Sequence, residues 1–195
     1  MFATAAFADD AAILTKIKSA NAQIKSIESA FKETKVQKVN GKKVDKNGSF
    51  YFVAPSKLAM LYIDPAGDKT VINGKEMLVK NASRNRAFNT DKNARMKQLS
   101  TILLCAIHGE IEALCEAVSA TSTASEKGDS YVVVINATKK SSKGYSKIEI
   151  TYAKTDGLIR QMVMTENNGD VTTYSLSGAT KNKTIADSHF STAKK

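Results

Sequence analysis

The residue types that carry out acid–base, nucleophilic or metal chemistry are few in this chain and stand apart from one another. Its 195 residues include two histidines and two cysteines. His108 and His189 have no carboxylate or cysteine at the spacing of a metal site, and Glu110 and Glu112 fall on a predicted helical turn where solvation is usual. The sequence has no phosphate loop, dinucleotide fingerprint, nucleophile elbow or HExxH motif. We therefore expect a protein that is not an enzyme and has no cofactor and no metal.

The two cysteines allow two interpretations. Cys105 and Cys115 are ten residues apart in a segment with helical spacing. A straight helix would separate them by about 15 Å, which is too far for a disulfide. A bend at Gly109 could fold one half of the segment back on the other and bring the sulfurs together. Two buried thiols and a disulfide both remain open from the sequence.

The charge is positive but spread along the chain. Twenty-nine Lys and Arg against nineteen acidic residues give a formal net charge of +10. Nucleic-acid binders cluster these cations on one element and interleave aromatic residues, whereas here the densest groups, 42–46 and 139–143, fall in predicted hairpin loops. We expect a solubilising surface and no nucleic-acid partner. Diffuse positive charge would also favour approach to anionic lipid or to an acidic partner.

The first ten residues, MFATAAFADD, are typical of the end of a secretory signal peptide. Ala6-Phe7-Ala8 has the small-x-small pattern of a cleavage site. Asp9 rather than a cysteine would begin the mature chain, so no lipid anchor is expected on it. No later segment reaches the roughly eighteen apolar residues of a membrane-spanning helix. The sequence thus predicts a signal-peptide remnant at 1–8 and a single soluble, exported, monomeric domain at 9–195.

The spacing of apolar residues predicts a helix, then strands. Over 10–31 it fits a helix capped by Asp9 or Asp10, with one apolar stripe. Beyond it the period changes to two, and Asn-Gly and Pro-containing turns separate short segments. The stripe consists of Ile13, Ile17, Ile24, Ile27 and Phe31, and strands are predicted at 32–40, 48–54, 57–64, 69–73, 76–81 and 84–89.

The second half repeats this order of elements. Helical spacing over 92–119 is interrupted at Gly109, which predicts two short helices. A Ser/Thr-rich stretch at 119–130 is interpreted as a loop. Strands are then predicted at 131–137, 146–153, 158–166 and 170–179, followed by a short closing piece. The fold class is α+β and mainly β, with about eleven antiparallel strands curled into a barrel or half-barrel whose open mouth the helices cover.

The stretch GSFYFVAPSKLAMLY, residues 48–62, is apolar on both faces of its two strands. A barrel wall that meets water should be polar on one side, so something must cover each face. Helices can cover one face and a ligand the other, or the first helix can fill the interior as an ordinary core. Methionines suit an adaptable lining because they repack around varied apolar shapes; they are Met60, Met77, Met96, Met162 and Met164.

The order of these segments resembles the LolA family, the periplasmic carriers of outer-membrane lipoproteins, and especially its Bacteroidetes-type members. The core of the resemblance is G-x-F-x-F-x-x-P-x-K-L-x-M-x-Y at 48–62. Further matching pieces are AFKET at 30–34, VINGK at 71–75, DGLI at 156–159 and the closing segment 182–190. The likeness covers nearly the whole predicted mature chain. Ala54 stands where the best-studied members carry an Arg that helps to hold the lid.

The resemblance implies an unclosed, strongly curved antiparallel half-barrel with helices as a lid over an apolar cavity. Such a protein takes a lipoprotein from an inner-membrane lipoprotein-releasing transporter, shields its acyl chains in the periplasm and passes it to an outer-membrane acceptor. Two alternatives remain: a carrier of another amphiphile, and a sensor or scaffold that binds a protein. By position, the cavity residues would be Phe50, Phe52, Leu58, Met60 and Tyr62, and the lid residues Ile17, Ile24, Leu99, Ile102, Leu103 and Ile107.

Overall fold

The computed structural model of the chain describes residues 4–139 and 144–193. The predicted remnant therefore lies partly outside the described residues, as do residues 140–143 of the second basic group. The helices are α1 (Thr4–Ala22), α2 (Ala94–His108) and α3 (Ile111–Val118), with 3-10 turns η1 (Thr90–Lys92) and η2 (Asp187–Phe190). The strands are β1 (Ser26–Val36), β2 (Lys43–Val53), β3 (Lys57–Asp64), β4 (Lys69–Asn73), β5 (Glu76–Asn81), β6 (Arg84–Asn89), β7 (Ala120–Lys127), β8 (Ser130–Ala137), β9 (Tyr145–Ala153), β10 (Ile159–Glu166) and β11 (Val171–Lys181).

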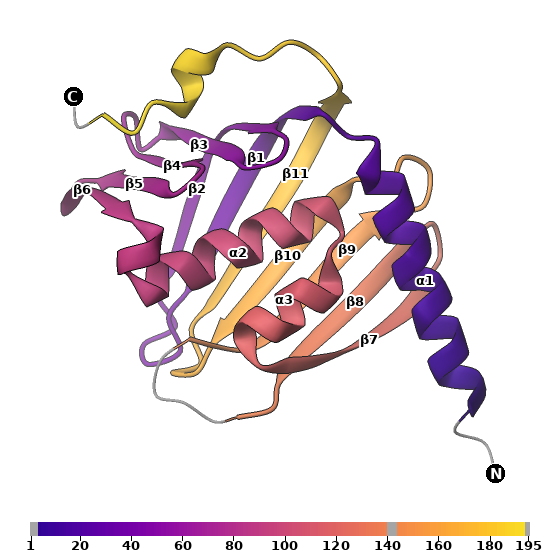
Figure 1. The fold of residues 1–195 in the computed structure, drawn as a ribbon. Helices are drawn as coiled ribbons and strands as arrows, with labels where there is room; N and C mark the ends of the chain where they lie inside the picture. The colour runs from indigo at the N-terminus through magenta and orange to yellow at the C-terminus, as the bar shows by residue number, and fades with distance from the viewer. Residues whose placement is uncertain (1–3, 140–143, 194–195) are drawn as a thin grey trace. The chain divides into compact units, whose positions relative to one another are not determined.

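The described strands form one eleven-stranded sheet. Their order is β6-β5-β4-β3-β2-β1-β11-β10-β9-β8-β7, so the sheet is unclosed and ends in β6 and β7 (Figure 1). The pairs from β2 to β6 and from β7 to β10 are antiparallel. The predicted fold class, a mainly β chain with an unclosed, curled antiparallel sheet of about eleven strands and helices, is confirmed.

Two compact units share this sheet. The first comprises the described parts of Met1–Gln23, Lys35–Lys43 and Cys105–Thr173. It contains α1, α3 and β7–β10. The second comprises Ile24–Thr34, Val44–Leu104 and the described part of Tyr174–Lys195. It contains β2–β6, most of α2 and η2. The prediction of a single domain at 9–195 stays a prediction.

The predicted helix over 10–31 is wrong at both ends. α1 begins at Thr4 and ends at Ala22, so Asp9 and Asp10 lie inside the helix instead of capping it. Ile24 lies in the connection after α1, and β1 begins at Ser26. In β1 the buried residues alternate with exposed ones, and Ile27 and Phe31 are 1% and 3% exposed. A spacing of four residues fits one face of a helix and one face of a strand, so the spacing of Ile27 and Phe31 does not distinguish the two.

The predicted loop at 119–130 is also wrong, because β7 occupies Ala120–Lys127. Its side chains give no apolar alternation, and only Ala124 is buried. The strand pairs with β8 in a continuous register from Ala120 opposite Ala137 to Lys127 opposite Ser130. As an edge strand it is specified by backbone hydrogen bonds to one neighbour and hardly by burial.

Other predicted elements match the structure. The strands at 57–64, 69–73, 76–81 and 84–89 coincide with β3 to β6. The helical segment breaks at Gly109, whose φ is +68° and whose neighbour Glu110 donates its backbone N–H to the Cys105 carbonyl at 2.9 Å. Among the described residues, no helix combines the length and the apolar character needed to cross a membrane.

Candidate apolar binding site

A row of large apolar side chains crosses the second unit from strand to strand. Phe52 of β2 lies opposite Leu58 of β3, Leu58 opposite Ile72 of β4, and Ile72 opposite Met77 of β5. All four side chains are 0% exposed. In a parallel row Phe50 lies opposite Met60, and these side chains are 2% and 4% exposed. The register thus brings four of the five predicted cavity residues together on one sheet face, hereafter the Phe52 face.

Tyr62, the fifth predicted residue, differs from the other four. It is half-buried and lies opposite Gly48, where an added Cβ would come within 2.1 Å of the Leu61 carbonyl oxygen. Its hydroxyl donates a hydrogen bond to the carboxylate of Glu33, and its ring meets Phe31 edge-on at 5.0 Å. Burial, with Tyr174 and Glu33 nearby, raises the pKa of Tyr62 well above its usual range. Tyr62 is therefore a polar-tipped neighbour of the apolar rows.

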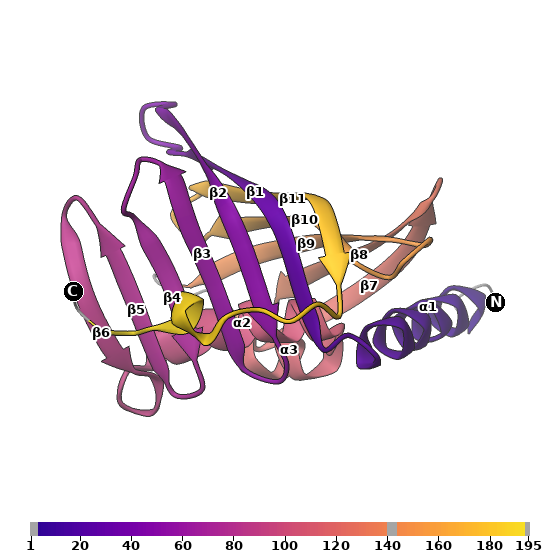
Figure 2. The same ribbon diagram turned by 90° about the horizontal axis from the view of Figure 1, so that it is seen from above.

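The opposite face of the same strands, hereafter the Ala59 face, is covered by the end of the chain. Its row runs from Tyr51 through Ala59, Val71 and Leu78. Phe190 of η2 joins this row in one buried cluster, with Ile185 packed against it. The His189 ring stacks on Tyr51 with centroids 4.1 Å apart and planes 8° apart. Figure 2 shows η2 and the first part of α2 on opposite sides of β3.

This arrangement answers what covers each side of the apolar motif. The closing segment covers the Ala59 face, so no ligand is needed there. The sequence contained the signal, since Ile185 and Phe190 are apolar residues in a polar tail. α2 is the helix of this unit that buries its apolar side chains, and it is the cover of the Phe52 face.

The predicted lid residues occupy different elements. Ile17 is on α1, and α2 carries all the others except Ile24, which the structure places in a connection instead of a helix. Leu99 is half-buried. The exposed fractions of the rest are 1% for Ile17, 5% for Ile24, 0% for Ile102, 4% for Leu103 and 4% for Ile107.

The last turn of α2 is fixed to the sheet by a buried tyrosine that sequence reasoning missed. The Tyr152 hydroxyl on β9 donates to the Ala106 carbonyl at 2.6 Å, and the side chain is 0% exposed. Burial raises the pKa of Tyr152 above its usual range. Ala54, where the family resemblance implies an arginine latch, instead donates its backbone N–H to the Lys25 carbonyl at 2.9 Å. Tyr152 thus provides a contact that holds α2 without an arginine.

Within the first unit, α1 packs closely against two glycines. A Cβ on Gly109, between α2 and α3, would lie 2.9 Å from Cγ2 of Ile17, and one on Gly157, before β10, would lie 2.5 Å from Cβ of Ala20. The buried Asn21 side chain donates from Nδ2 to the Gly157 carbonyl at 2.9 Å. Both glycines have positive φ, so larger residues would be strained as well as crowded.

Two grooves flank α1 in the first unit. One, of about 690 Å³, lies against α3 and mixes Leu14 and Ile111 with acidic side chains such as Glu112. The other, of about 400 Å³, lies against β7 and includes Ile13 and Lys16. Neither groove is lined by the residues of the Phe52 face. These grooves are open surface features, whereas the predicted cavity residues are packed against protein.

The two cysteines are not joined by a disulfide. Cys105 and Cys115 are free thiols, with Cys105 buried. Burial, with Glu110 adding to it, raises the pKa of the Cys105 thiol to about 11. Burial also raises the pKa of the Cys115 thiol, and a hydrogen bond with the Ser122 side chain opposes this by lowering it. Across the described parts of the chain, His, Cys, Asp and Glu side chains form no group of three that could hold a metal ion.

Comparisons with known proteins show which solved structures resemble this fold. No curated protein sequence matches the chain. Among solved structures, a domain assigned to outer-membrane lipoprotein sorting from Vibrio parahaemolyticus is 12% identical, with a TM-score of 0.50, over 94% of this chain and 96% of that one. A conserved protein from Thermus thermophilus is 10% identical, with a TM-score of 0.53, over 93% and 92% of the two chains.

A chain of the Pseudomonas aeruginosa MucA/MucB complex is 11% identical, with a TM-score of 0.51. The alignment covers 94% of this chain and 60% of that chain. At these identities the likenesses show a shared fold. The model of the outer membrane lipoprotein carrier protein LolA matches residues 22–193. Since this match spans most of the sequence, the chain belongs to the LolA family.

Proposed function

We propose that the protein is a periplasmic carrier that binds the acyl chains of lipoproteins against the Phe52 face, beneath α2. The observation that carries this proposal is the unbroken apolar row of Phe52, Leu58, Ile72 and Met77 on that face. Family membership supports it, since the family is that of an outer-membrane lipoprotein carrier. An inner-membrane transporter would supply the cargo and an outer-membrane acceptor would take it.

Energetics favour a carrier that works without a nucleotide. Burying an acyl chain of about 16 carbons removes it from water with a gain of about 12 kcal/mol. Cargo would therefore not leave the protein into water. Because it comes from one membrane and returns to another, the net free energy of each transfer is small. Small changes in how well α2 closes over the site are then enough to set the direction.

The packed state of the site implies that binding requires α2 to move. Phe50, Phe52, Leu58 and Met60 are all at most 4% exposed when the site holds only protein. A ligand must take the place of the α2 side chains, among which Ile102 and Leu103 are buried. Methionines at 60 and 77 help, because unbranched side chains repack around a new apolar shape.

A fluorescence titration with an acyl-like apolar dye, followed by competition with a purified lipoprotein, tests the proposal. We expect saturable dye binding that the lipoprotein displaces. Met60→Glu should abolish it, because a charge would be buried in the site. Ile63→Glu is the matched control: it makes the same kind of change on the same strand at a side chain that is 67% exposed. Absence of saturable binding by the folded protein would overturn the proposal.

The first alternative concerns the cargo. Another amphiphile, such as a free lipid or an apolar precursor, would fit the same apolar face. Native mass spectrometry of protein extracted from its own compartment distinguishes the two by the added mass. A lipoprotein mass supports the proposed carrier, whereas a small-lipid mass would replace it with a lipid carrier.

The second alternative is a sensor or scaffold that binds a protein. The dense packing of Phe52 and Leu58 favours it, because a filled interior needs no ligand. The structurally similar chain from the MucA/MucB complex also comes from a protein–protein assembly. A folded protein that takes up neither dye nor lipid, and yet retains a protein partner in a pull-down, would support this alternative.

A further inference from the structure

The β1–β2 hairpin ends in an apolar side chain that faces water. Val39 is 89% exposed, the highest value among the exposed large apolar side chains in the described residues. It lies in the turn between β1 and β2, within Gln37–Lys42. Turns favour Gly, Asn, Asp, Ser and Pro, and a β-branched apolar residue gains nothing there from exposure.

The turn that presents Val39 is held by its own hydrogen bonds. The Gln37 N–H donates to the Lys42 carbonyl and the Gly41 N–H to the Gln37 carbonyl, both at 2.9 Å. Asn40 Oδ1 accepts from the Lys42 N–H at 3.0 Å. The φ of +65° at Gly41 is one that glycine adopts without strain. Val39 therefore projects from a closed turn.

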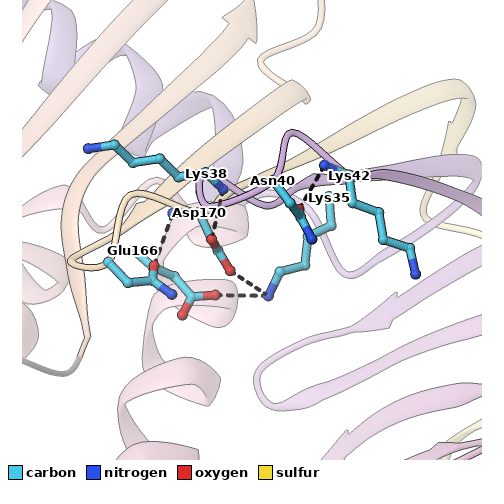
Figure 3. Close-up of polar contacts among 7 residues, drawn as sticks. Lys35, Lys38, Asn40, Lys42, Glu166 and Asp170 are labelled. Atoms are coloured by element: carbon cyan, nitrogen blue, oxygen red, sulfur yellow. Dashed lines mark hydrogen bonds and ion pairs between the residues drawn. The ribbon is translucent and has the colours of Figure 1, made fainter.

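The base of the hairpin is braced against the turn between β10 and β11 (Figure 3). The Lys35 ammonium lies 3.2 Å from Oε1 of Glu166 and 3.7 Å from Oδ2 of Asp170. The Lys38 backbone N–H donates to Oδ1 of Asp170 at 3.1 Å. The aliphatic part of Lys38 lies over Gly169, where an added Cβ would come within 2.3 Å of its Cδ. These contacts use the carboxylates of Glu166 and Asp170 to hold the hairpin.

Two lysines flank Val39 in the turn and extend to opposite sides of it. In Figure 3 the side chain of Lys38 runs back over the turn between β10 and β11, whereas that of Lys42 extends to the other side, away from Glu166 and Asp170. Both lysines are exposed. Each can keep its ammonium in the aqueous layer while its methylene groups lie along an apolar region. The tip, defined as Lys38, Val39 and Lys42, therefore combines one apolar side chain with two cations.

We propose that this tip docks on the surface of an anionic lipid bilayer, with Val39 entering the headgroup region and Lys38 and Lys42 meeting lipid phosphates. A bilayer fits the charges, since anionic headgroups lie above an apolar layer and each lysine near such a surface favours binding. It also fits the small convex shape, because a protein interface needs on the order of 1,000 Å² of buried surface, which a three-residue tip does not provide. Docking needs no cargo and is independent of the carrier function.

Co-sedimentation of the full chain with vesicles tests the proposal. We expect binding to mixed phosphatidylglycerol–phosphatidylcholine vesicles and little binding to pure phosphatidylcholine. The double variant Lys38→Gln/Lys42→Gln should weaken binding roughly tenfold or more, and Val39→Ser about threefold. The charge-matched control Lys92→Gln/Lys127→Gln, at exposed lysines elsewhere, should weaken it less than about twofold. Equal losses from the two double variants would overturn the proposal in favour of diffuse charge attraction.

Insertion of the tip can be observed directly because the chain has no tryptophan. Val39→Trp places the chain's single tryptophan at the tip, and Lys127→Trp places it at another exposed position. We expect the emission of Val39→Trp, and not that of Lys127→Trp, to shift to the blue on anionic vesicles. An unchanged Val39→Trp spectrum on vesicles that do bind the protein would mean that the tip stays in water, and the proposal would fail.

Discussion

The Phe52 face and the Ala59 face of β2–β5 are both apolar, but they differ in side-chain size and in what covers them. The Ala59 face carries the small residues Ala59 and Val71 between the larger Tyr51 and Leu78, and it is covered by the closing segment of the chain. The Phe52 face carries Phe52, Leu58 and Met77 and is covered by α2. Ala59 and Val71 leave room for the Phe190 side chain of η2, which joins them in one buried cluster.

The closing segment and α2 are also held on their faces by different kinds of contact. The closing segment is held by polar contacts as well as by packing: Lys57 lies 2.8 Å from Asp187, and Asn73 Nδ2 donates to the Phe190 carbonyl at 3.3 Å. The other face buries flexible methionines such as Met60 and Met77, and the hydrogen bond that fixes α2, from Tyr152 to the Ala106 carbonyl, lies at the last turn of the helix. The comparison indicates that η2 is part of the core, and it supports the proposal that α2 is the cover that a ligand displaces.

The largest effect is expected from removing the anchor of the closing segment. Phe190→Ala should lower the free energy of unfolding by about 3–5 kcal/mol, because Phe190 is 0% exposed and its loss leaves a cavity in the Ala59 face. Urea denaturation followed by circular dichroism measures this. Phe190→Leu, which keeps most of the volume, should cost clearly less. A loss below about 1 kcal/mol for Phe190→Ala would show that η2 is not part of the core.

Substitutions at Ala59 and Met60, which are neighbours on β3, test the two faces directly. Ala59→Leu should cost about 1–3 kcal/mol, because extra methylene groups would push η2 off a close contact. Met60→Leu should cost less than about 1.5 kcal/mol, since it conserves volume on the adaptable face. The same denaturation experiment measures both. Equal costs would remove the distinction between a tight face and an adaptable one.

Removing the hydrogen bond from Tyr152 to Ala106 should have a smaller effect on the free energy of unfolding and a clearer effect on the motion of α2. Tyr152→Phe removes a buried hydrogen bond and should cost about 1 kcal/mol. It should also let the last turn of α2 open more often, which exposes Cys105. In a Cys115→Ser background, the rate at which a maleimide labels Cys105 should therefore rise.

The chemistry of Cys105 makes this measurement sensitive. With the pKa of its thiol at about 11, only a very small fraction of the buried group is thiolate near neutral pH, so labelling in the closed state is slow. Tyr131→Phe, a half-buried tyrosine on β8, is the matched control and should leave the rate unchanged. Equal labelling of the wild type and Tyr152→Phe would show that Tyr152 does not restrain α2.

The smallest effect is expected at the ion pair that borders the closing segment. Lys57→Gln should cost less than about 1 kcal/mol, because the Asp187 side chain is 85% exposed and water screens the pair. The cost should shrink further in high salt. A double-mutant cycle with Asp187→Asn measures the pair alone. A large coupling free energy would mean that electrostatics, and not Phe190, holds η2 on the Ala59 face.

Much of the second unit could be predicted because local signals agree there. Alternating apolar residues and strong turn signals such as Asn73-Gly74 predict β3 to β6 with the bounds that the structure has. The same alternation placed Phe50, Phe52, Leu58 and Met60 on one face, and the register confirms that grouping. Their role in binding acyl chains stays a prediction.

The predictions for residues 10–31 and 119–130 are wrong because the side-chain pattern there is weak or fits two kinds of secondary structure. Ile27 and Phe31, four residues apart, fit a helix and a strand equally well, and pairing within the sheet decided for a strand. β7 has one buried residue, Ala124, so its sequence looked like a polar loop. An edge strand takes its structure from its neighbour's backbone, which no side-chain pattern records.

The sequence by itself determined the strand periods, the break at Gly109 and the apolar character of both faces of residues 48–62. These follow from side-chain hydrophobicity and turn chemistry, which act over a few residues. Only the tertiary structure decided that Phe190 covers one face, that Tyr152 fixes α2 through Ala106, and that Val39 projects from a braced hairpin. Each of these depends on residues far apart in the chain, whose meeting is set by packing and pairing of the whole sheet.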